Sequence, residues 1–386
     1  MSNCSAVNAA LAELGFHGSY RPQDITFLLK ACDIQPTPVA EKERLIQSGL
    51  KHYSEMISEE KPPTAEHMAH FQHALKLGAE RLAAEVQQLG HSLSARFPAQ
   101  PVVLVSLVRA GVPLGVLLKH QLEKTQPCFH YGISIIRDRG LDLAALNAII
   151  RQHGADNIVF VDGWTGKGAI CRQLTQSLSS YPELFDDGWE IPRLVTLSDL
   201  GGYSWLSAGC EDWLIPFGIL GSVISGLTSR SVLNAEISPS QMQDGCLNPD
   251  HWHNCVIYDH LKADDLSLQF ILQILDLIQQ QPHAEKAGWS NAMRSQQQQR
   301  SLNTVQWIAQ HYGVDNINLI KPSIAEATRA VLRRVPERIL IQDSAHPDVQ
   351  LLLHFAQERA IPVDILGGQL GPYHAVTLIK KVEKKQ

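Results

Sequence analysis

The chain alternates short apolar runs with amphipathic stretches of helical spacing. Apolar runs at about Val102 to Leu107, Phe129 to Ile136, Ile158 to Val161 and Leu194 to Leu197 are rich in β-branched residues, which is typical of buried parallel strands. Strands that alternate with helices indicate a sheet with helices packed on its faces. The pattern therefore predicts an α/β fold with a parallel sheet.

Two helical stretches precede the first of these strands. Helical spacing extends from Val39 to Ile57 and from Thr64 to Phe97, and the side chain of Thr64 is suited to cap the second helix. We therefore expect residues 1–98 to form a helical amino-terminal extension that packs on a core domain of residues 99–280.

A polar stretch separates this core from the rest of the chain. Residues 281–300 include four consecutive glutamines and predict a linker. Beyond it, RILIQ is predicted as a strand, VQLLLHFAQERA as a helix and AVTLIK as a strand. Residues 301–386 are therefore predicted to form a second, small α/β domain.

Composition narrows the class of protein. A chain of 386 residues with 44% hydrophobic content has room for two or three domains, and a net charge of -6 does not indicate a nucleic-acid or membrane partner for the surface as a whole. The seven cysteines are widely spaced without a CxxC pair, and the start of the chain lacks the pattern of a signal peptide. We therefore expect a cytoplasmic protein with reduced thiols and no membrane partner.

The stretch NIVFVDGWTGKGAI, Asn157 to Ile170, places an acid at the end of a predicted strand and a glycine-rich turn before a helix. Glycines let the backbone approach a ligand, and free N–H groups at the start of a helix attract an anion. The turn is not a Walker A loop, because Lys167 is followed by Gly168. Since ligands of parallel sheets bind at the carboxyl ends of the strands, residues 162–168 are predicted to bind a phosphate group.

Two further loops place arginines at predicted strand ends. Arg109, in LVRAGVPLG, can contact a pyrophosphate group through two N–H groups, and Gly111 allows a tight turn there. SIIRDRGLD places Arg137 and Arg139 after another strand. All three arginines are expected near the phosphate loop.

IVFVDGWTGKGAI resembles the motif with which type I phosphoribosyltransferases bind phosphoribosyl pyrophosphate (PRPP). The resemblance implies the parallel sheet of that family and a hood at about Trp205 to Leu233. It also implies that Asp162 contacts the ribose hydroxyls, although Gly163 stands where many members have a second acid. Residues implied in catalysis are Asp162, Arg109 and Arg137. Residues implied in PRPP binding are Arg109, Ala110, Gly111, Arg139, Asp162, Gly163, Thr165, Gly166, Lys167 and Gly168.

Together with GSYRPQDITFLLK, EKERLIQSGLKHYSEMISEE and EDWLIPFGILGSVISGLTSR, these motifs resemble a bacterial phosphoribosyltransferase-like family of tellurite-resistance and stress operons. Some members carry the label cysteine protease StiP. The resemblance implies transfer of phosphoribose from PRPP, with Mg²⁺, to an unknown nitrogen acceptor, which we expect to be nucleobase-like. Two alternatives stay open: an RNA-binding regulator that senses PRPP, and a cytosolic cysteine protease, which needs a Cys/His pair in contact. A homo-oligomer is also left open.

KPSIAEATRAVLRRVPERILIQDSAHPDVQLLLHFAQERAIPVDIL resembles the RNA-binding fold of Pelota and the ribosomal L7Ae proteins. Residues 321–386 hold ten Lys/Arg against seven Asp/Glu, so this part is positive in a negative chain. The resemblance implies that structured RNA is a partner. The residues expected to contact it are Lys321, Glu326, Arg329, Arg333 and Arg334.

Two cysteine-containing features are given structural interpretations. CLNPDHWHNC, Cys246 to Cys255, offers thiols and imidazoles, but their spacing matches no usual zinc site, so no metal site is predicted. Cys171 follows the phosphate loop within a predicted helix, where we expect it to be a buried helical residue.

Overall fold

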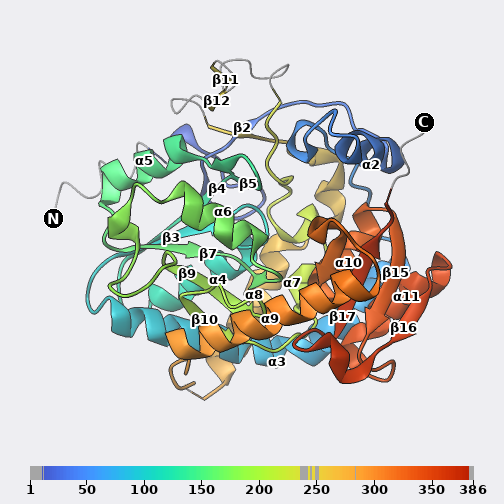
Figure 1. The fold of residues 1–386 in the computed structure, drawn as a ribbon. Helices are drawn as coiled ribbons and strands as arrows, with labels where there is room; N and C mark the ends of the chain where they lie inside the picture. The colour runs from blue at the N-terminus through green and yellow to red at the C-terminus, as the bar shows by residue number, and fades with distance from the viewer. Residues whose placement is uncertain are drawn as a thin grey trace.

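A parallel sheet forms the centre of the protein. The computed structural model describes residue 11 and residues 13–234, 242–243, 246–247, 252–282 and 284–381. Within them, a seven-stranded sheet has the order β1-β4-β3-β7-β9-β10, with β8 paired to β9, and every pairing in it is parallel (Figure 1). The strands are β1 (Thr26–Phe27), β3 (Val102–Leu107), β4 (Cys128–Ile133), β7 (Ile158–Val161), β8 (Trp164–Thr165), β9 (Leu194–Asp199) and β10 (Leu206–Gly209).

The central strands follow the apolar runs of the sequence. Strands β3 and β7 have the bounds predicted for them. All of their side chains are buried, as expected of apolar runs in a central parallel strand. The run predicted from Phe129 to Ile136 is divided, because β5 (Ile135–Ile136) leaves the sheet to pair with β6 (Gly140–Leu141). The mixed α/β class with a mostly parallel sheet is therefore confirmed.

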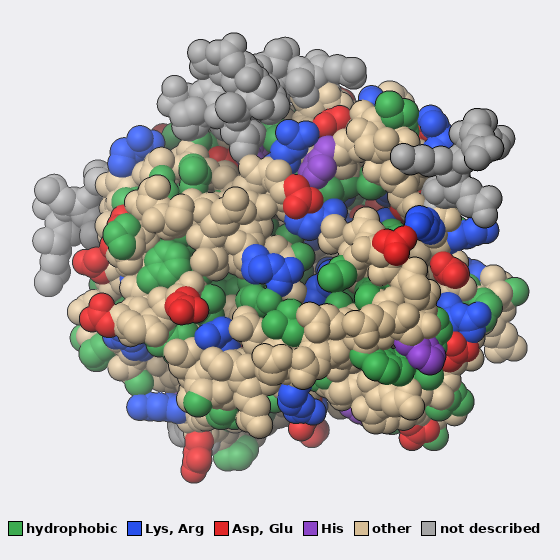
Figure 2. Space-filling model, viewed as in Figure 1, with side chains coloured by type: hydrophobic (Ala, Val, Ile, Leu, Met, Phe, Trp, Pro, Cys, Tyr) green, Lys and Arg blue, Asp and Glu red, His purple; other side chains and the backbone are tan. Residues whose placement is uncertain are grey.

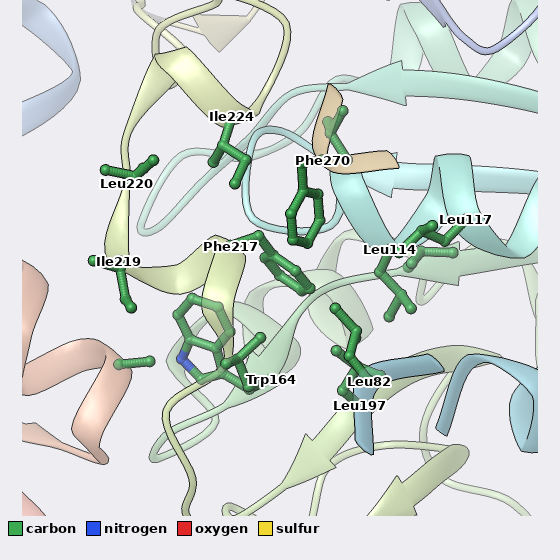
Figure 3. Close-up of a cluster of buried hydrophobic side chains, with 14 of the residues drawn as sticks. Leu82, Leu114, Leu117, Trp164, Leu197, Phe217, Ile219, Leu220, Ile224 and Phe270 are labelled. Atoms are coloured by element: carbon green, nitrogen blue, oxygen red, sulfur yellow. The ribbon is translucent and has the colours of Figure 1, made fainter. Parts of the chain in front are cut away.

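Helices cover both faces of the sheet. On one side, α3 (Ala65–Arg96) packs against α4 (Val112–Leu122) and α8 (Ser267–Gln280), and the Thr64 hydroxyl caps α3 by accepting from the His67 N–H. On the other side, α5 (Leu143–His153) and α6 (Ala169–Ser177) bury leucines against β3 and β7. Leu82 of α3 lies with Leu114 of α4 and Leu197 of β9 in the core shown in Figure 3.

The amino-terminal segment is part of this core, and it is less helical than predicted. β1 extends the main sheet, and β2 (Lys30–Ala31) pairs with β13 (Asn254–Cys255). The helix predicted from Val39 to Ile57 ends early, since α2 spans Val39–Gln47.

The segment from Trp205 to Leu233, predicted as a hood, packs into the core, and a phosphoribosyltransferase-type fold is not confirmed. Its first residues form β10 of the sheet, and α7 (Pro216–Ile219) is fully buried. Phe217 lies between Trp164 and Phe270, with ring centroids 6.3 and 6.2 Å away (Figure 3). These apolar side chains close the core, so the segment does not form a separate cover over a site.

The carboxyl-terminal residues form a second sheet with the order β14-β17-β15-β16, beside the first (Figure 1). Its elements are β14 (Ile320–Pro322), α10 (Ile324–Arg333), β15 (Pro336–Ile341), α11 (Gln350–Glu358), β16 (Val363–Ile365) and β17 (Ala375–Ile379). Helix α9 (Asn291–His311) leads into it, so the second half of the predicted linker is helical. Within the described part of the chain, no helix combines the length and apolar character that crossing a bilayer requires.

Candidate functional site

The two loops predicted to bind phosphate meet at one edge of the main sheet. Residues 109–111 follow β3 and residues 162–168 follow β7, and these strands are neighbours at the point where the strand order reverses. Such a point leaves a crevice at the carboxyl ends of the strands. At Gly111 a Cβ atom would lie 2.0 Å from the carbonyl oxygen of Val161, so only glycine lets the loops approach this closely.

Polar groups of the predicted phosphate loop are already bound to the protein. The Thr165 hydroxyl donates to Asp199 Oδ1 at 2.5 Å, and the Lys167 ammonium donates to the carbonyl oxygens of Ile317, at 2.9 Å, and Ile320. Gly166 faces the Glu326 carboxylate, which would lie 2.8 Å from a Cβ atom at that position. The carboxyl-terminal domain therefore occupies much of the surroundings in which a phosphate group was expected.

Arg109 is also engaged. Its guanidinium donates to Glu60 Oε2 at 2.7 Å and to the Thr228 carbonyl oxygen at 2.8 Å. Burial alone would raise the pKa of Glu60, but the charges of Arg109 and Arg333 lower it to about 2. Arg109 is thus held in place by the Glu60 carboxylate, while its buried Nε has no hydrogen-bond partner among the described residues.

Residues predicted to bind RNA lie in the same crevice. Arg329, Arg333, Arg334 and Glu326 line a cavity of about 330 Å³ together with Asp162. The Arg329 guanidinium lies 4.7 Å from the centroid of the Trp164 ring and donates to the Gly218 carbonyl oxygen. The structure therefore joins two predicted sites into one, which we call the interdomain cleft.

The cleft opens into a larger cavity of about 1380 Å³, where basic side chains outnumber acidic ones. Figure 2 shows Lys and Arg side chains in the hollow between the core and the carboxyl-terminal domain. Arg137 lies 5.3 Å from the Tyr53 ring centroid, and Arg139 pairs with Glu55 at 3.4 Å. The basic residues that line this cavity are Lys42, Lys51, Arg137, Arg139, Lys167, Arg230, Lys321, Arg333, Arg334, Lys380 and Lys381.

Burial makes these charges unfavourable in the absence of an anion. It is the largest cause that lowers the pKa of Lys42 and Lys321 to about 8, and that of Arg333 to about 10. In contrast, burial raises the pKa of Asp162 to about 7. A negatively charged ligand would favour the charged forms of the lysines and arginines.

Cysteine chemistry needs a thiolate and a base. Of the described cysteines, none has its Sγ hydrogen-bonded to a histidine ring. Cys171 borders the interdomain cleft, but burial and the nearby carboxylates of Asp199 and Asp162 raise the pKa of its thiol well above its usual value. The side chains of Cys4 and Cys246 lie outside the described residues.

A second hollow, of about 430 Å³, brings Cys210 together with His346 and His374. The two imidazole rings are 4.3 Å apart between centroids. Nδ1 of His374 is buried and has no hydrogen-bond partner among the described residues, while its backbone N–H donates to Asp212 Oδ2 at 2.9 Å. We call this the Cys210 hollow. It was missed in the sequence because its members come from distant positions that share no local motif.

The protonation states in this hollow are set mainly by burial. Burial, and then the neighbouring His346, lower the pKa of His374, which favours a neutral imidazole that can accept a proton. Burial also raises the pKa of the Cys210 thiol, whereas the positive charge of Arg300 opposes that shift. Both shifts favour the neutral thiol and the neutral imidazole, so formation of a thiolate here would depend on a change in the surroundings when a substrate binds.

Another buried group resembles a catalytic triad but has a different geometry. Ser134 Oγ lies 2.6 Å from His253 Nδ1, and Asp142 Oδ2 accepts from the backbone N–H of His253 at 2.6 Å. Asp142 also caps α5 by accepting from the Ala145 N–H. Because the carboxylate holds the backbone of His253 and not its ring, these contacts stabilise the fold. Within the stretch Cys246 to Cys255, His253 is thereby assigned a structural role.

Comparison with known proteins gives two family matches. A family described as tellurite-like stress resistance cysteine protease StiP matches residues 18–275, and the PELOTA RNA-binding domain matches residues 299–381. A protein of Acinetobacter baylyi named cysteine protease StiP is 52% identical over 371 residues, which cover 96% of each chain. An archaeal alanine:glyoxylate aminotransferase structure is similar at a TM-score of 0.20 and 11% identity, over 98% of this chain and 90% of that one.

These matches correct the predicted function. The family description and the relative at 52% identity both name a cysteine protease, so the prediction of a phosphoribosyltransferase is wrong and the protease alternative is better supported. The predicted enzyme class, a glycosyltransferase, is therefore also wrong. The contacts agree with this correction, because the Thr165 hydroxyl expected on a phosphate group is bound to Asp199.

Proposed function

The chain belongs to the StiP family, and we propose that it is a cysteine protease in which Cys210 is the nucleophile and His374 the general base. The observation that carries this assignment is the unpartnered Nδ1 of His374 in a hollow that Cys210 also lines. A buried imidazole nitrogen without a partner is costly, and it gains a hydrogen bond if it accepts the thiol proton.

The proposed reaction follows from these two groups. His374 Nδ1 takes the proton of the Cys210 thiol, and the thiolate attacks the carbonyl carbon of the scissile peptide bond. The same proton then passes to the leaving amine as the C–N bond breaks, leaving an acyl-thioester on Cys210. Water, deprotonated by His374, attacks this thioester and releases the carboxylic acid, which restores the thiol. The imidazole and thiol need approach only when substrate is bound, as is common for catalytic pairs.

Asp212 is proposed as a positioning residue. Its carboxyl group accepts backbone N–H groups from Ile324 at 3.0 Å and from His374 at 2.9 Å. Ile324 begins α10 and His374 precedes β17, so one buried side chain of the core ties the base and the start of α10 to the core. The catalytic hollow is therefore incomplete without the carboxyl-terminal domain.

A mixture of fluorogenic peptides is the test substrate, with hydrolysis followed for wild type and for Cys210→Ala and Cys171→Ala variants. We expect hydrolysis by wild type and by Cys171→Ala, and none by Cys210→Ala. Loss of activity in Cys171→Ala alone would indicate that Cys171, at the interdomain cleft, is the nucleophile. Equal activity in all three proteins would exclude both Cys171 and Cys210 as the nucleophile.

A second candidate function is the binding of an anionic ligand in the interdomain cleft. The specific observation in its favour is the set of buried or partly buried basic side chains around the larger cavity that the cleft opens into, among them Lys42, Lys321 and Arg333. PRPP with Mg²⁺ and structured RNA both stay proposals for the occupant. The cavity of about 330 Å³ is of the size of small-ligand pockets, which favours PRPP, whereas RNA would have to reach α10 through the opening, since that helix packs against α7 of the core.

Calorimetry on the full chain separates these ligands. PRPP with Mg²⁺, pyrophosphate and a structured RNA are titrated in turn at low and moderate salt. Binding of PRPP or pyrophosphate supports a small-ligand site, and binding of RNA alone, with a steep salt dependence, supports the nucleic-acid partner. An absence of heat for all of them would leave the protease proposal as the only function.

A further inference from the structure

The contact between α3 and α11 brings two imidazoles and two carboxylates together. Glu66 and His70 lie one helical turn apart on α3, and His354 and Glu358 lie one turn apart on α11. Each pair therefore points to the same side of its own helix. The two helices come from opposite ends of the chain, so this group is assembled only in the folded protein.

The ligand atoms lie close enough to converge on one ion. His354 Nε2 lies 3.1 Å from Glu66 Oε1 and 3.7 Å from Glu358 Oε2, and the His70 and His354 rings are 4.7 Å apart between centroids. One potential ligand atom from each of Glu66, His70 and His354 falls within 4.8 Å of the other two. Two ligands placed about 2.0–2.1 Å from a tetrahedral zinc ion are themselves roughly 3.3 Å apart.

We propose that Glu66, His70 and His354 bind a Zn²⁺ ion, with Glu358 as a fourth ligand, and that the ion fastens the carboxyl-terminal domain to α3. Imidazole nitrogen and carboxylate oxygen are ligands that Zn²⁺ accepts, and two of each neutralise its charge.

An ion pair alone explains less of the geometry. The contact between Glu66 and His354 satisfies both of those groups, but it gives no reason for a second imidazole beside the first. Two imidazoles that approach each other in this way repel one another when both are protonated. A cation that accepts both nitrogens turns the same approach into a favourable interaction.

The surroundings hold the two helices in register and leave the site accessible. Next to Glu66, the His67 ring stands edge-on to Phe355 of α11 at 5.6 Å and contacts the Ile219 carbonyl oxygen at 3.2 Å. The Glu66 and Glu358 side chains are about half exposed, at 57% and 47%. An ion can therefore reach ligands whose backbones are already positioned.

Metal-free full-length protein provides the test. Zn²⁺ affinity is measured by competition with a chromophoric chelator, and Co²⁺ reports the ligand geometry by its visible spectrum. We expect one ion per chain and a tetrahedral Co²⁺ spectrum. Removing a residue that hydrogen-bonds to a metal ligand typically lowers metal affinity by about 10–100-fold, and removing the ligand itself should cost at least as much. His70→Ala and His354→Ala should therefore each weaken Zn²⁺ binding by about tenfold or more.

Controls distinguish this site from others. His311→Ala removes an exposed histidine of α9 and should leave the affinity unchanged. His346→Ala tests the imidazole pair of the Cys210 hollow, and it should also bind normally. The proposal is overturned if wild type does not bind Zn²⁺, if His354→Ala binds it equally well, or if a sulfur-to-cobalt charge-transfer band shows that cysteines are the ligands.

Discussion

The interdomain cleft and the Cys210 hollow both form where the carboxyl-terminal domain meets the core, yet they differ in how their polar groups are used. In the cleft and the larger cavity beside it, Thr165 and Lys167 are bound to protein partners. In the hollow, the Nδ1 of His374 has none within the described structure. A residue in a motif that predicts ligand binding can therefore have a structural role. A residue that belongs to no motif can be the one that has a polar atom available for a substrate.

The two regions also differ in electrostatics. The cleft combines many buried cations with few acids, so its energy improves when an anion enters. The Cys210 hollow is mixed, with Arg300 opposed by Glu211 and Asp348, and burial favours neutral forms of its thiol and imidazole. The first arrangement suits the binding of an anion, and the second keeps a thiol and an imidazole uncharged.

The largest expected effect separates two neighbouring imidazoles in the hollow. His374→Gln should lower kcat for peptide hydrolysis by about 10⁴-fold, because it removes the proposed base. His346→Gln is the matched control, since Nδ1 of His346 already accepts from the Asp348 N–H at 3.2 Å and is not free. We expect that control to lose less than about tenfold. Similar losses in both variants would show that the assignment of the base is wrong.

A large effect on stability is expected at the wall of the cleft. Arg334, after α10, makes two hydrogen bonds to Glu43 of α2, whose side chain is only 1% exposed. Arg334→Ala leaves that carboxylate buried without its cation, so the free energy of unfolding should fall by about 3–5 kcal/mol in urea titrations.

Arg338→Ala is the control for this change. Its pair with Asp364 is also 2.7 Å long but lies nearer the solvent, with side-chain exposures of 36% and 29%. The loss there should be about 1 kcal/mol or less. Equal losses in the two variants would mean that burial of Glu43 does not determine the strength of the first pair.

Much of the fold could be predicted because its signals are local. An apolar run such as Val102 to Leu107 makes a buried strand wherever it folds, and Thr64 caps its helix with its own side chain. The strand-to-helix loops at 109–111 and 162–168 were also found, since strand and turn are adjacent in sequence. The burial of α7, within the segment from Trp205 to Leu233, could not be predicted, because it depends on side chains such as Phe270, which lies far along the chain.

The candidate site was less predictable for the same reason. Whether Lys167 points to a ligand or to the carbonyl oxygen of Ile317 depends on where the second domain packs. Cys210 and His374 are brought together only by that packing. Roles that arise from long-range contacts leave no pattern of spacing in the sequence.

A smaller effect is expected on ligand binding in the cleft. Lys321→Met removes one of the cations that are buried around the larger cavity, and the affinity for pyrophosphate should fall by about tenfold, or 1.4 kcal/mol. Lys262→Met removes an exposed lysine outside the cleft and should leave the affinity unchanged in the same titration. A loss in both would indicate a general effect of net charge.

The smallest effect is a pH dependence at Asp162. Its folded pKa of about 7 lies above the ordinary value of 3.8, so the folded state holds this proton more tightly than the unfolded chain. Stability from this group is complete below the unfolded pKa and is lost as pH rises through the folded one. Asp162→Asn imitates the protonated form. Relative to wild type, it should therefore be more stable at about pH 8, by on the order of 1 kcal/mol, and nearly equal at about pH 4.

Glu60, which pairs with Arg109, provides a control of opposite sign. Its pKa of about 2 lies below the ordinary value of 4.5, so its contribution is present above the unfolded pKa and is lost as pH falls through the folded one. Glu60→Gln should therefore be destabilised at about pH 8, and the deficit should shrink on acidification. If Asp162→Asn instead follows the pattern of Glu60→Gln, the Asp162 carboxylate is ionised and paired, and Arg329 is the cation that holds it.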